Sequence, residues 1–420
     1  MTYHPRLLFL VSTLALATAG ISFGVRSSIA GDLERVFFAP IDPANSAALT
    51  GSALGIAFLG FALTIAIGSP LLDWIGMRPL LVLSSLSFLA GTSTVLWGGS
   101  HRTVWLGMVV IGVGWGLVET VINPLCAATY PNDQTHRMNV LHAWWPGGVI
   151  LGGLLGLLLA QASWQVKLLV TMVPAALFGA LASQLAFPPT ARKAAGLPAS
   201  AMFRELRRPM FLVWFASMFL TAASELAPGQ WVDLALTRTV GMRGIWLLVY
   251  VSGIMFVMRH FAGRLAHRLS PVGLLWLGCL LAALGLLALS RADSPGSALL
   301  AATLWGTGVC YLWPTMLASA SERFPRGGAL LLGLMGTAGT LSSFFVLPLL
   351  GRVFDQAKIA AAGGEAAFAQ LTGARREEVL SAAARQSFEA VAALPAILLL
   401  VFGAIWWRER RARLATSRPA

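Results

Sequence analysis

The short segment Gly263-Arg264-Leu265-Ala266-His267-Arg268 is the most informative part of the sequence about the fold, because a related segment occurs much earlier in the chain. The earlier copy reads Ser69-Pro70-Leu71-Leu72-Asp73-Trp74-Ile75-Gly76-Met77-Arg78, and both copies adjoin long apolar runs. Asp73 precedes His267 by the same number of residues as Tyr130-Pro131 precedes Phe324-Pro325. A repeat on this scale predicts a chain built from two similar halves.

The composition places these halves in a membrane. Of the 420 residues, 57% are hydrophobic and only 11% are charged, and the mean hydropathy is +0.75. A soluble domain carries about 25% charged residues, because its surface must be hydrated. The apolar residues are spread along the whole chain, which excludes a soluble enzyme with a single anchor. The three cysteines are scattered, and we expect them to form neither a disulfide framework nor a metal site.

Twelve apolar stretches are long enough to cross the membrane as helices, which takes roughly 20 residues for a hydrocarbon layer of ~30 Å. We therefore predict an all-α membrane protein with twelve transmembrane helices in two six-helix pseudo-repeats. The spans fall at about residues 7–30, 46–72, 79–100, 103–130, 138–163, 168–189, 209–232, 244–258, 269–290, 294–321, 327–351 and 390–407.

The boundary between the halves is a basic segment without a long apolar run, at residues 190–208. It predicts a cytoplasmic linker between an N-terminal half, residues 1–189, and a C-terminal half, residues 209–420. The C-terminal half would carry a long outer loop at 352–389 and a basic cytoplasmic tail. The first apolar run also resembles a signal peptide, but it continues through Val25 and further spans follow, which favours a first transmembrane helix.

Basic residues in the short loops set the expected orientation. They concentrate on the side that holds the linker and the tail, which predicts that both termini face the cytoplasm. Among them are Arg78, Arg137, Arg259 and Arg323. The net charge of +13 reflects this bias and an attraction to anionic lipid. We expect a multi-pass monomer in a cell membrane, in particular a bacterial inner membrane, with the lipid bilayer around it and no nucleic-acid partner.

The two opening stretches resemble the G-x-L-A-D-R-x-G-R-R signature of the major facilitator superfamily. The later copy matches it closely except that His267 replaces the acid, and the earlier copy keeps Asp73, Gly76 and Arg78. The resemblance implies the major facilitator fold over the whole chain, with a short cytoplasmic gating loop in each half. The gating-loop candidates are Asp73, Gly76, Arg78, Gly263, Arg264, His267 and Arg268.

A narrower resemblance begins at residue 112. The pattern Gly112-x-Gly114-x-Gly116-x-x-Glu119-x-x-x-Asn123-Pro124, followed by Arg137-Met138-Asn139, is similar to the fucose–proton symporter branch. The resemblance implies that Glu119 is the proton-titrating carboxylate and that Asn123 and Asn139 belong to the sugar pathway. That branch has an acid in its first helix, whereas this sequence has Arg26 in the comparable stretch.

Only Arg26, Glu119 and Glu225 lie well inside the predicted spans as charged residues. A charge in the hydrocarbon layer costs at least ~2.5–3.5 kcal/mol, so these three residues are candidates for function. Trp115, Glu119 and Asn123 share one helical face, and an indole, a carboxylate and an amide suit a polyol. The alternative is a buried ion pair between Glu119 and Arg26 that holds two helices together.

Glu225 is followed by Pro228-Gly229, which could interrupt the seventh span and let backbone groups line a cavity. Gln230 and Trp231 would add a hydrogen-bonding amide and a stacking surface. This pattern predicts a substrate-lining cluster, and the alternative is an acid at the outer end of a helix. His142, the only histidine inside a predicted span, is a candidate for a proton relay or for a structural hydrogen bond.

The sequence therefore predicts a secondary active transporter that carries a sugar or a related small polar solute by proton symport. No G-x-x-x-x-G-K-[ST] motif occurs, which excludes an ATP motor within the chain, and we expect no enzyme activity, cofactor or metal. The alternatives are proton-driven efflux of amphipathic compounds and a sensor that keeps the fold without transport. Proton coupling would involve Glu119, Glu225, Arg26 and His142, and substrate binding Trp115, Asn123, Asn139, Gln230 and Trp231.

Overall fold

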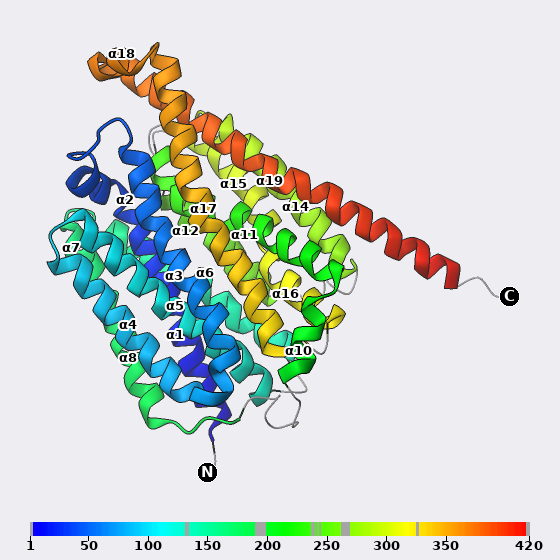
Figure 1. The fold of residues 1–420 in the computed structure, drawn as a ribbon. Helices are drawn as coiled ribbons and strands as arrows, with labels where there is room; N and C mark the ends of the chain where they lie inside the picture. Colours follow the sequence, from blue (N-terminus) through cyan, green and yellow to red (C-terminus); the bar gives the residue numbers. More distant parts are fainter. Residues whose placement is uncertain are drawn as a thin grey trace.

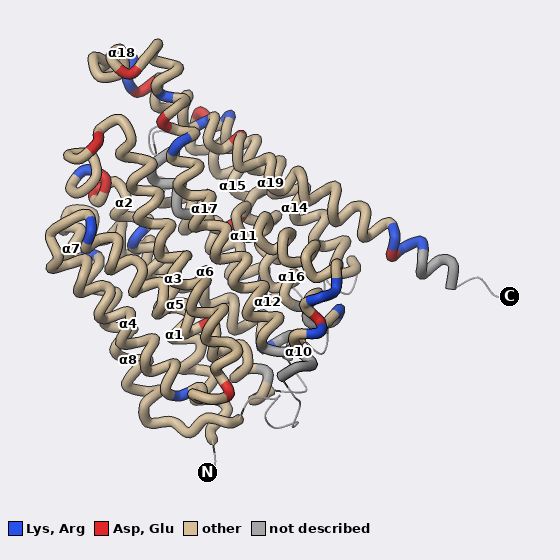
Figure 2. The backbone as a smooth tube through the Cα atoms, in the orientation of Figure 1, with Lys and Arg blue, Asp and Glu red and all other residues tan. Residues whose placement is uncertain are grey.

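The computed structural model describes residues 3–130, 134–189, 199–236, 240, 242, 245–261, 269–324 and 327–416. Helices make up nearly all of this part, and no strand occurs among these residues. Figure 1 shows a bundle of long helices, and Figure 2 shows charged residues mainly at its two ends, with few in the middle. Helices satisfy the hydrogen-bonding groups of their own backbone, and a largely uncharged middle suits the hydrocarbon layer of a bilayer. The predicted all-α membrane fold is confirmed.

Six membrane-crossing segments form the first half of the bundle. Short helices α2 (Ala30–Leu33) and η1 (Glu34–Phe38), a π-helix, connect the first segment to the second. The six segments are α1 (Pro5–Ser28), α3 (Ser46–Ile75), α4 (Met77–Trp97), α5 (His101–Thr129), α6 (Gln134–Leu158), and α7 (Trp164–Leu169) continued by α8 (Met172–Gln184).

Six more segments form the second half, with α10 (Ala199–Leu206) before them and α18 (Glu365–Gln370) between the last two. In the described part of the chain, ten helices are long and apolar enough to cross a membrane, and α12 and the α15–α16 pair complete the twelve predicted spans. The six are α11 (Pro209–Leu236), α12 (Ile245–His260), α14 (Pro271–Ser290), α15 (Pro295–Val309) continued by α16 (Leu312–Arg323), α17 (Gly328–Ala362) and α19 (Gly373–Thr416).

The two halves repeat local structure as well as helix order. Ser100 caps α5 and Ser294 caps α15, and each forms a capping box with the hydroxyl residue three positions later, Thr103 or Ser297. A capping box satisfies backbone N–H groups that the start of a helix leaves unpaired. Helices α5 and α15 are the fourth segments of their halves, so equivalent helices begin with the same capping box.

Two helix pairs make the main contacts between the halves, α3 with α17 and α6 with α12. Glycine allows a close approach in the first pair, since a Cβ atom on Gly51 of α3 would lie 2.8 Å from the carbonyl oxygen of Leu347 in α17. Close packing of small residues is a main source of attraction between helices in lipid. The halves are therefore joined by intimate helix contacts.

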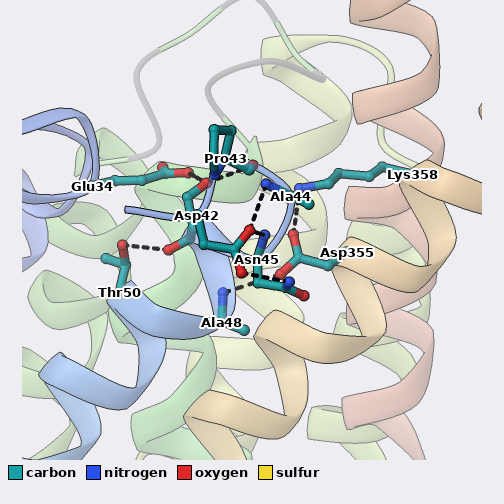
Figure 3. A network of polar contacts seen from close by, with 10 residues as sticks. Glu34, Asp42, Pro43, Ala44, Asn45, Ala48, Thr50, Asp355 and Lys358 are labelled. Carbon is teal, nitrogen blue, oxygen red and sulfur yellow. Dashed lines mark hydrogen bonds and ion pairs between the residues drawn. The ribbon is translucent and has the colours of Figure 1, made fainter. Parts of the chain in front are cut away.

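A network of polar contacts stabilises one end of the α3–α17 interface (Figure 3). Asp355 of α17 accepts a hydrogen bond of 3.1 Å from the backbone N–H of Ala48 in the first turn of α3, and it binds the Lys358 ammonium at 2.5 Å. The N-cap residue of α3, Asn45, accepts no hydrogen bond from the first turn of the helix. Asp355 of the other half therefore accepts one from a backbone N–H that the start of the helix leaves unpaired. The Asn45 amide instead donates to Asp42, which holds the pKa of that carboxyl below its ordinary value.

The segment 352–389, expected as a long outer loop, is mostly helical. Helix α17 continues to Ala362 and α19 begins at Gly373, so both project beyond the bundle with α18 at the tip (Figure 1). The segment is rich in alanine, which has the highest helix propensity. Of the predicted linker 190–208, residues 190–198 lie outside the described part, and α10 occupies most of the remainder.

Candidate functional site

Three residues that the sequence selects form a hydrogen-bonded row within the first half. In α5, the Asn123 amide donates to the Glu119 carboxylate, with an Nδ2–Oε2 distance of 2.8 Å. His142 of α6 lies on the other side of that amide, with its Nε2 atom 2.9 Å from Asn123 Oδ1. Glu119 and Asn123 share a helical face because they are four residues apart. The row thus joins two titratable groups through one amide.

A buried ion pair lies in the second half, between Arg259 of α12 and Glu225 of α11. Their side chains are 3% and 8% exposed, and Arg259 Nη2 is 3.2 Å from Glu225 Oε1. The predicted eighth span ends at residue 258, which places Arg259 in a cytoplasmic loop. This prediction is wrong, because α12 continues to His260 and keeps the guanidinium inside the bundle.

Two prolines explain why Arg259 also binds backbone carbonyl groups. Its Nη1 donates to the carbonyl oxygen of His142 at 3.0 Å, and its Nε donates to that of Cys310 at 2.9 Å. In an α-helix each oxygen would accept the N–H four residues later. Those positions are Pro146 and Pro314, and proline has no N–H. The prolines leave both carbonyl groups free, and the guanidinium supplies their donors.

Pro228 of α11 has the same effect on Ser224. The Ser224 carbonyl oxygen accepts a hydrogen bond of 3.0 Å from the Trp305 indole N–H of α15. Helix α11 nevertheless continues to Leu236, so the prediction that Pro228-Gly229 interrupts it is wrong. A neighbouring side chain satisfies the freed backbone group, as is usual for proline in membrane helices.

The two sets of contacts meet at His142, which lies at the interface between the halves. Its ring contacts Asn123, and its backbone carbonyl accepts from Arg259. A continuous polar network therefore runs from Glu119 in the first half to Glu225 in the second. Because α6 and α12 belong to different halves, a relative movement of the halves would change the Arg259–His142 contact.

A small cavity of about 30 Å³ adjoins this network at the interface. Its wall includes Phe23 of α1 and Trp145 of α6 on one side, and Glu225 and Trp305 on the other. Glu225 Oε2 has no hydrogen-bond partner among the described residues. The volume accommodates roughly two water molecules, so a sugar does not fit into the cavity as it stands.

Arg26 of α1 lies apart from both carboxylates. Its Nη2 donates to the carbonyl oxygen of Leu54 at 2.9 Å, and its Cζ lies 4.7 Å from the centre of the Trp115 ring. The alternative ion pair with Glu119 does not form among the described contacts, since Glu119 binds Asn123 instead. Trp115 is fully buried among other aromatic rings and does not line the cavity.

The sequence matches the family model of the Major Facilitator Superfamily over residues 7–347, which covers most of the chain. The chain belongs to the major facilitator superfamily. Among solved structures, this superfamily member is similar to a D-xylose–proton symporter, with a TM-score of 0.76 and 18% identity, covering 94% of this chain and 97% of that one. It is also similar to the xylose transporter XylE from E. coli, with a TM-score of 0.74 and 16% identity, covering 95% and 98%. At these identities the likeness shows the fold.

Among curated proteins, this superfamily member is similar to Monosaccharide-sensing protein 2 of Arabidopsis thaliana. The two are 28% identical over 138 residues, which is 32% of this chain. The chain therefore spans about a fifth (19%) of the length of that relative. These comparisons establish the superfamily, and membership of the fucose–proton symporter branch stays a prediction.

The superfamily signature loop is described in the first half only. Gly76 ends α3 with a φ of +94°, which favours glycine. Arg78 donates to the Ser183 carbonyl near the end of α8, and Asp73 lies in the last turn of α3. Within the described ranges, no cluster of His, Cys, Asp and Glu is suited to a metal ion. The second copy (Gly263, Arg264, His267 and Arg268) and the side chains of Asn139, Gln230 and Trp231 lie outside the described residues.

Proposed function

We propose that the protein is a secondary active transporter that moves a sugar or a related small polar solute together with protons. The observation that carries this proposal is the polar network that joins Glu119 to Glu225 across the two halves. Ionisable groups within membrane segments are costly and mark solute or proton pathways. In alternating access the two halves rock about a site between them, and this network lies where such a movement acts.

Glu225 is the acid whose protonation the proposal links to movement of the halves. It binds Arg259 through Oε1 and lines the cavity. A carboxylate binds a guanidinium much more strongly than a neutral carboxylic acid does. Protonation of Glu225 therefore weakens its hold on Arg259, which changes the contact with His142 in the other half. Glu119 is the second proton carrier, connected to the same arginine through Asn123 and His142.

The solute would bind in an enlarged form of the cavity. Phe23, Trp145 and Trp305 offer aromatic surfaces, and Glu225 and Ser252 offer hydrogen-bonding groups. The present volume is too small for a sugar, so binding requires separation of the halves. The Asp355 network holds together the end of the α3–α17 contact near α18, which supports access from the opposite end, where the N-terminus lies (Figure 1).

The second candidate function is efflux of amphipathic compounds. It is favoured by the wall of the cavity, most of which is apolar: Phe23, Leu226, Leu248, Val251 and Met255 lie there. A drug pump uses such a surface with few fixed polar partners, whereas a sugar transporter needs several. The two candidates therefore differ in which solute a proton gradient moves.

Uptake by the purified protein in proteoliposomes distinguishes the two functions. With an acidic outside, we expect a labelled monosaccharide or sugar derivative to accumulate above its outside concentration, and a protonophore to abolish the accumulation. A fluorescent amphipathic dye should show no gradient-dependent movement. Dye movement without accumulation of any sugar derivative would contradict symport and support efflux.

Replacing Pro146 with alanine is expected to weaken the contact between the halves while keeping every polar side chain. The new N–H at position 146 competes with Arg259 for the His142 carbonyl, so the hydrogen bond from Arg259 in the other half weakens. A hydrogen bond to a charged group contributes about 1.5–3 kcal/mol. Double electron–electron resonance between spin labels on α6 and α12 should then show a larger population of molecules in which the two halves are further apart.

The matched control is Pro295→Ala, because Pro295 lies at the first turn of α15 and frees no carbonyl within a helix. It should leave the distance distribution unchanged. Identical distributions for Pro146→Ala and the wild type would show that the freed carbonyl plays no part in holding the halves together.

A further inference from the structure

Arg26 differs from the other buried basic side chains that the structure describes. Each of the other buried lysine and arginine side chains has a carboxylate within 4 Å, whereas no ion pair of Arg26 occurs among the described residues. An uncompensated buried charge costs several kcal/mol. The paired residues are Lys167 with Asp32 at 3.8 Å, Arg259 with Glu225 at 3.2 Å, and Lys358 with Asp355 at 2.5 Å.

Arg26 and Trp115 together present N–H groups without acceptors. Arg26 is 0% exposed, and its Nε and Nη1 atoms have no hydrogen-bond partner in the described part of the chain. The indole Nε1 of Trp115, whose ring lies under the guanidinium, also has none. Both side chains are donors only. The chemical complement of this pair is therefore a group that only accepts hydrogen bonds and carries negative charge.

The pair lies one layer of side chains behind the cavity wall. Phe23 and Trp145 form that wall, and their ring centres lie 6.3 Å and 5.7 Å from the centre of the Trp115 ring. Phe23 and Arg26 are three residues apart on α1, and therefore on one side of the helix. A shift of Phe23 and Trp145 would open the cavity onto the donor groups of Arg26 and Trp115.

The far side of the cavity has the opposite character. Glu225 lines it and has one carboxylate oxygen without a hydrogen-bond partner among the described residues. A carboxylate attracts hydroxyl donors and repels a second negative charge. A ligand that fits both sides has a single negative group at one end and hydroxyl groups at the other.

We propose that the transported solute is a sugar acid or a similar hydroxylated monocarboxylate, whose carboxylate pairs with Arg26 and the Trp115 N–H. This inference rests on the transport function proposed above and names its substrate class. The hydroxyl groups of the solute then contact the cavity wall at Glu225. In the absence of solute, the Leu54 carbonyl and the Trp115 ring compensate the Arg26 charge only in part.

A matched pair of solutes tests the assignment, since D-glucuronate differs from D-glucose only in its carboxylate. In proteoliposomes we expect uptake of D-glucuronate to exceed that of D-glucose at least tenfold. Arg26→Met should lower this ratio at least tenfold, and Arg26→Lys should lower it less. The control is Lys167→Met, which removes a buried cation away from the cavity and should leave the ratio unchanged.

Thermal melting in detergent supplies a second measurement. Arg26→Met should melt at or above the wild-type temperature in the absence of solute, because it removes an unpaired buried charge. Added D-glucuronate should raise the melting temperature of the wild type and not that of Arg26→Met. If Arg26→Met fails to fold, the test passes to Arg26→Lys. An Arg26→Lys protein that folds and selectively loses affinity for D-glucuronate supports the inference. Any other result for Arg26→Lys shows that Arg26 is structural and overturns the inference.

The outcomes separate this inference from the transport function. Accumulation of D-glucose without binding of D-glucuronate would overturn the inference and leave sugar transport standing. An increase in the melting temperature with chloride alone, and no further increase with D-glucuronate, would also overturn the inference. Failure of the wild type to move any sugar or sugar acid along a proton gradient would instead contradict the transport function.

Discussion

Arg259→Gln is expected to abolish coupled uptake and to lower the free energy of unfolding by about 3–5 kcal/mol, the usual cost of removing one partner of a buried ion pair. The substitution leaves Glu225 as a buried charge without its cation. It also removes guanidinium donors from the carbonyl oxygens of His142 and Cys310. Chemical unfolding in detergent micelles measures the loss of stability, and proteoliposome uptake measures the loss of transport.

Two controls isolate the buried pair. The double variant Glu225→Gln with Arg259→Gln removes both charges and should recover most of the lost stability without recovering coupled uptake. Arg375→Gln breaks the exposed pair with Glu378, whose side chains are 63% and 68% exposed, and should cost about 0–1 kcal/mol. An Arg259→Gln protein that unfolds like the wild type would contradict the role assigned to this pair.

Glu119→Gln is expected to eliminate proton-driven accumulation while solute counterflow continues. Glutamine is nearly isosteric, and its side-chain oxygen can still accept the hydrogen bond from Asn123, so the row that leads to His142 keeps its geometry. It cannot take up or release a proton at this position. Accumulation along a pH gradient should fall to the level seen with a protonophore, and exchange of labelled for unlabelled solute should stay within a few-fold of wild type.

The control for Glu119→Gln is Asp293→Asn, which neutralises an exposed acid before α15. It should accumulate solute as the wild type does. Wild-type accumulation by Glu119→Gln would show that protons are carried elsewhere, and loss of counterflow would show that Glu119 serves solute binding or structure rather than coupling.

The bundle and its repeat could be predicted because they depend on local properties of the sequence. Apolar runs of sufficient length form helices in lipid whatever their neighbours, and spacing alone places Glu119 beside Asn123. The continuation of α17 beyond residue 351, where the predicted span ends, was missed because the apolar pattern stops there. Alanine content carries the helix onward from Arg352 to Ala362, beyond the apolar run.

The connections between helices were harder to predict. Arg259 follows an apolar run and resembles an ordinary basic residue at a helix end. A usable signal did exist in Pro146 and Pro314, each of which leaves a carbonyl group four residues earlier in need of a donor. Which donor satisfies it depends on tertiary packing. For the same reason the spacing of Trp115 predicted a solute-stacking surface, whereas packing places its ring behind Phe23 and Trp145.

We propose that protons and solute move together through the Glu119–Glu225 network. A pH-sensitive dye sealed inside wild-type proteoliposomes measures this coupling. The experiment starts without a pH gradient, and potassium with valinomycin clamps the membrane potential. Addition of a transported sugar or sugar acid should acidify the interior, and the acidification should be absent in Glu119→Gln vesicles that still exchange the solute. Solute uptake by the wild type without any change in internal pH would contradict proton symport.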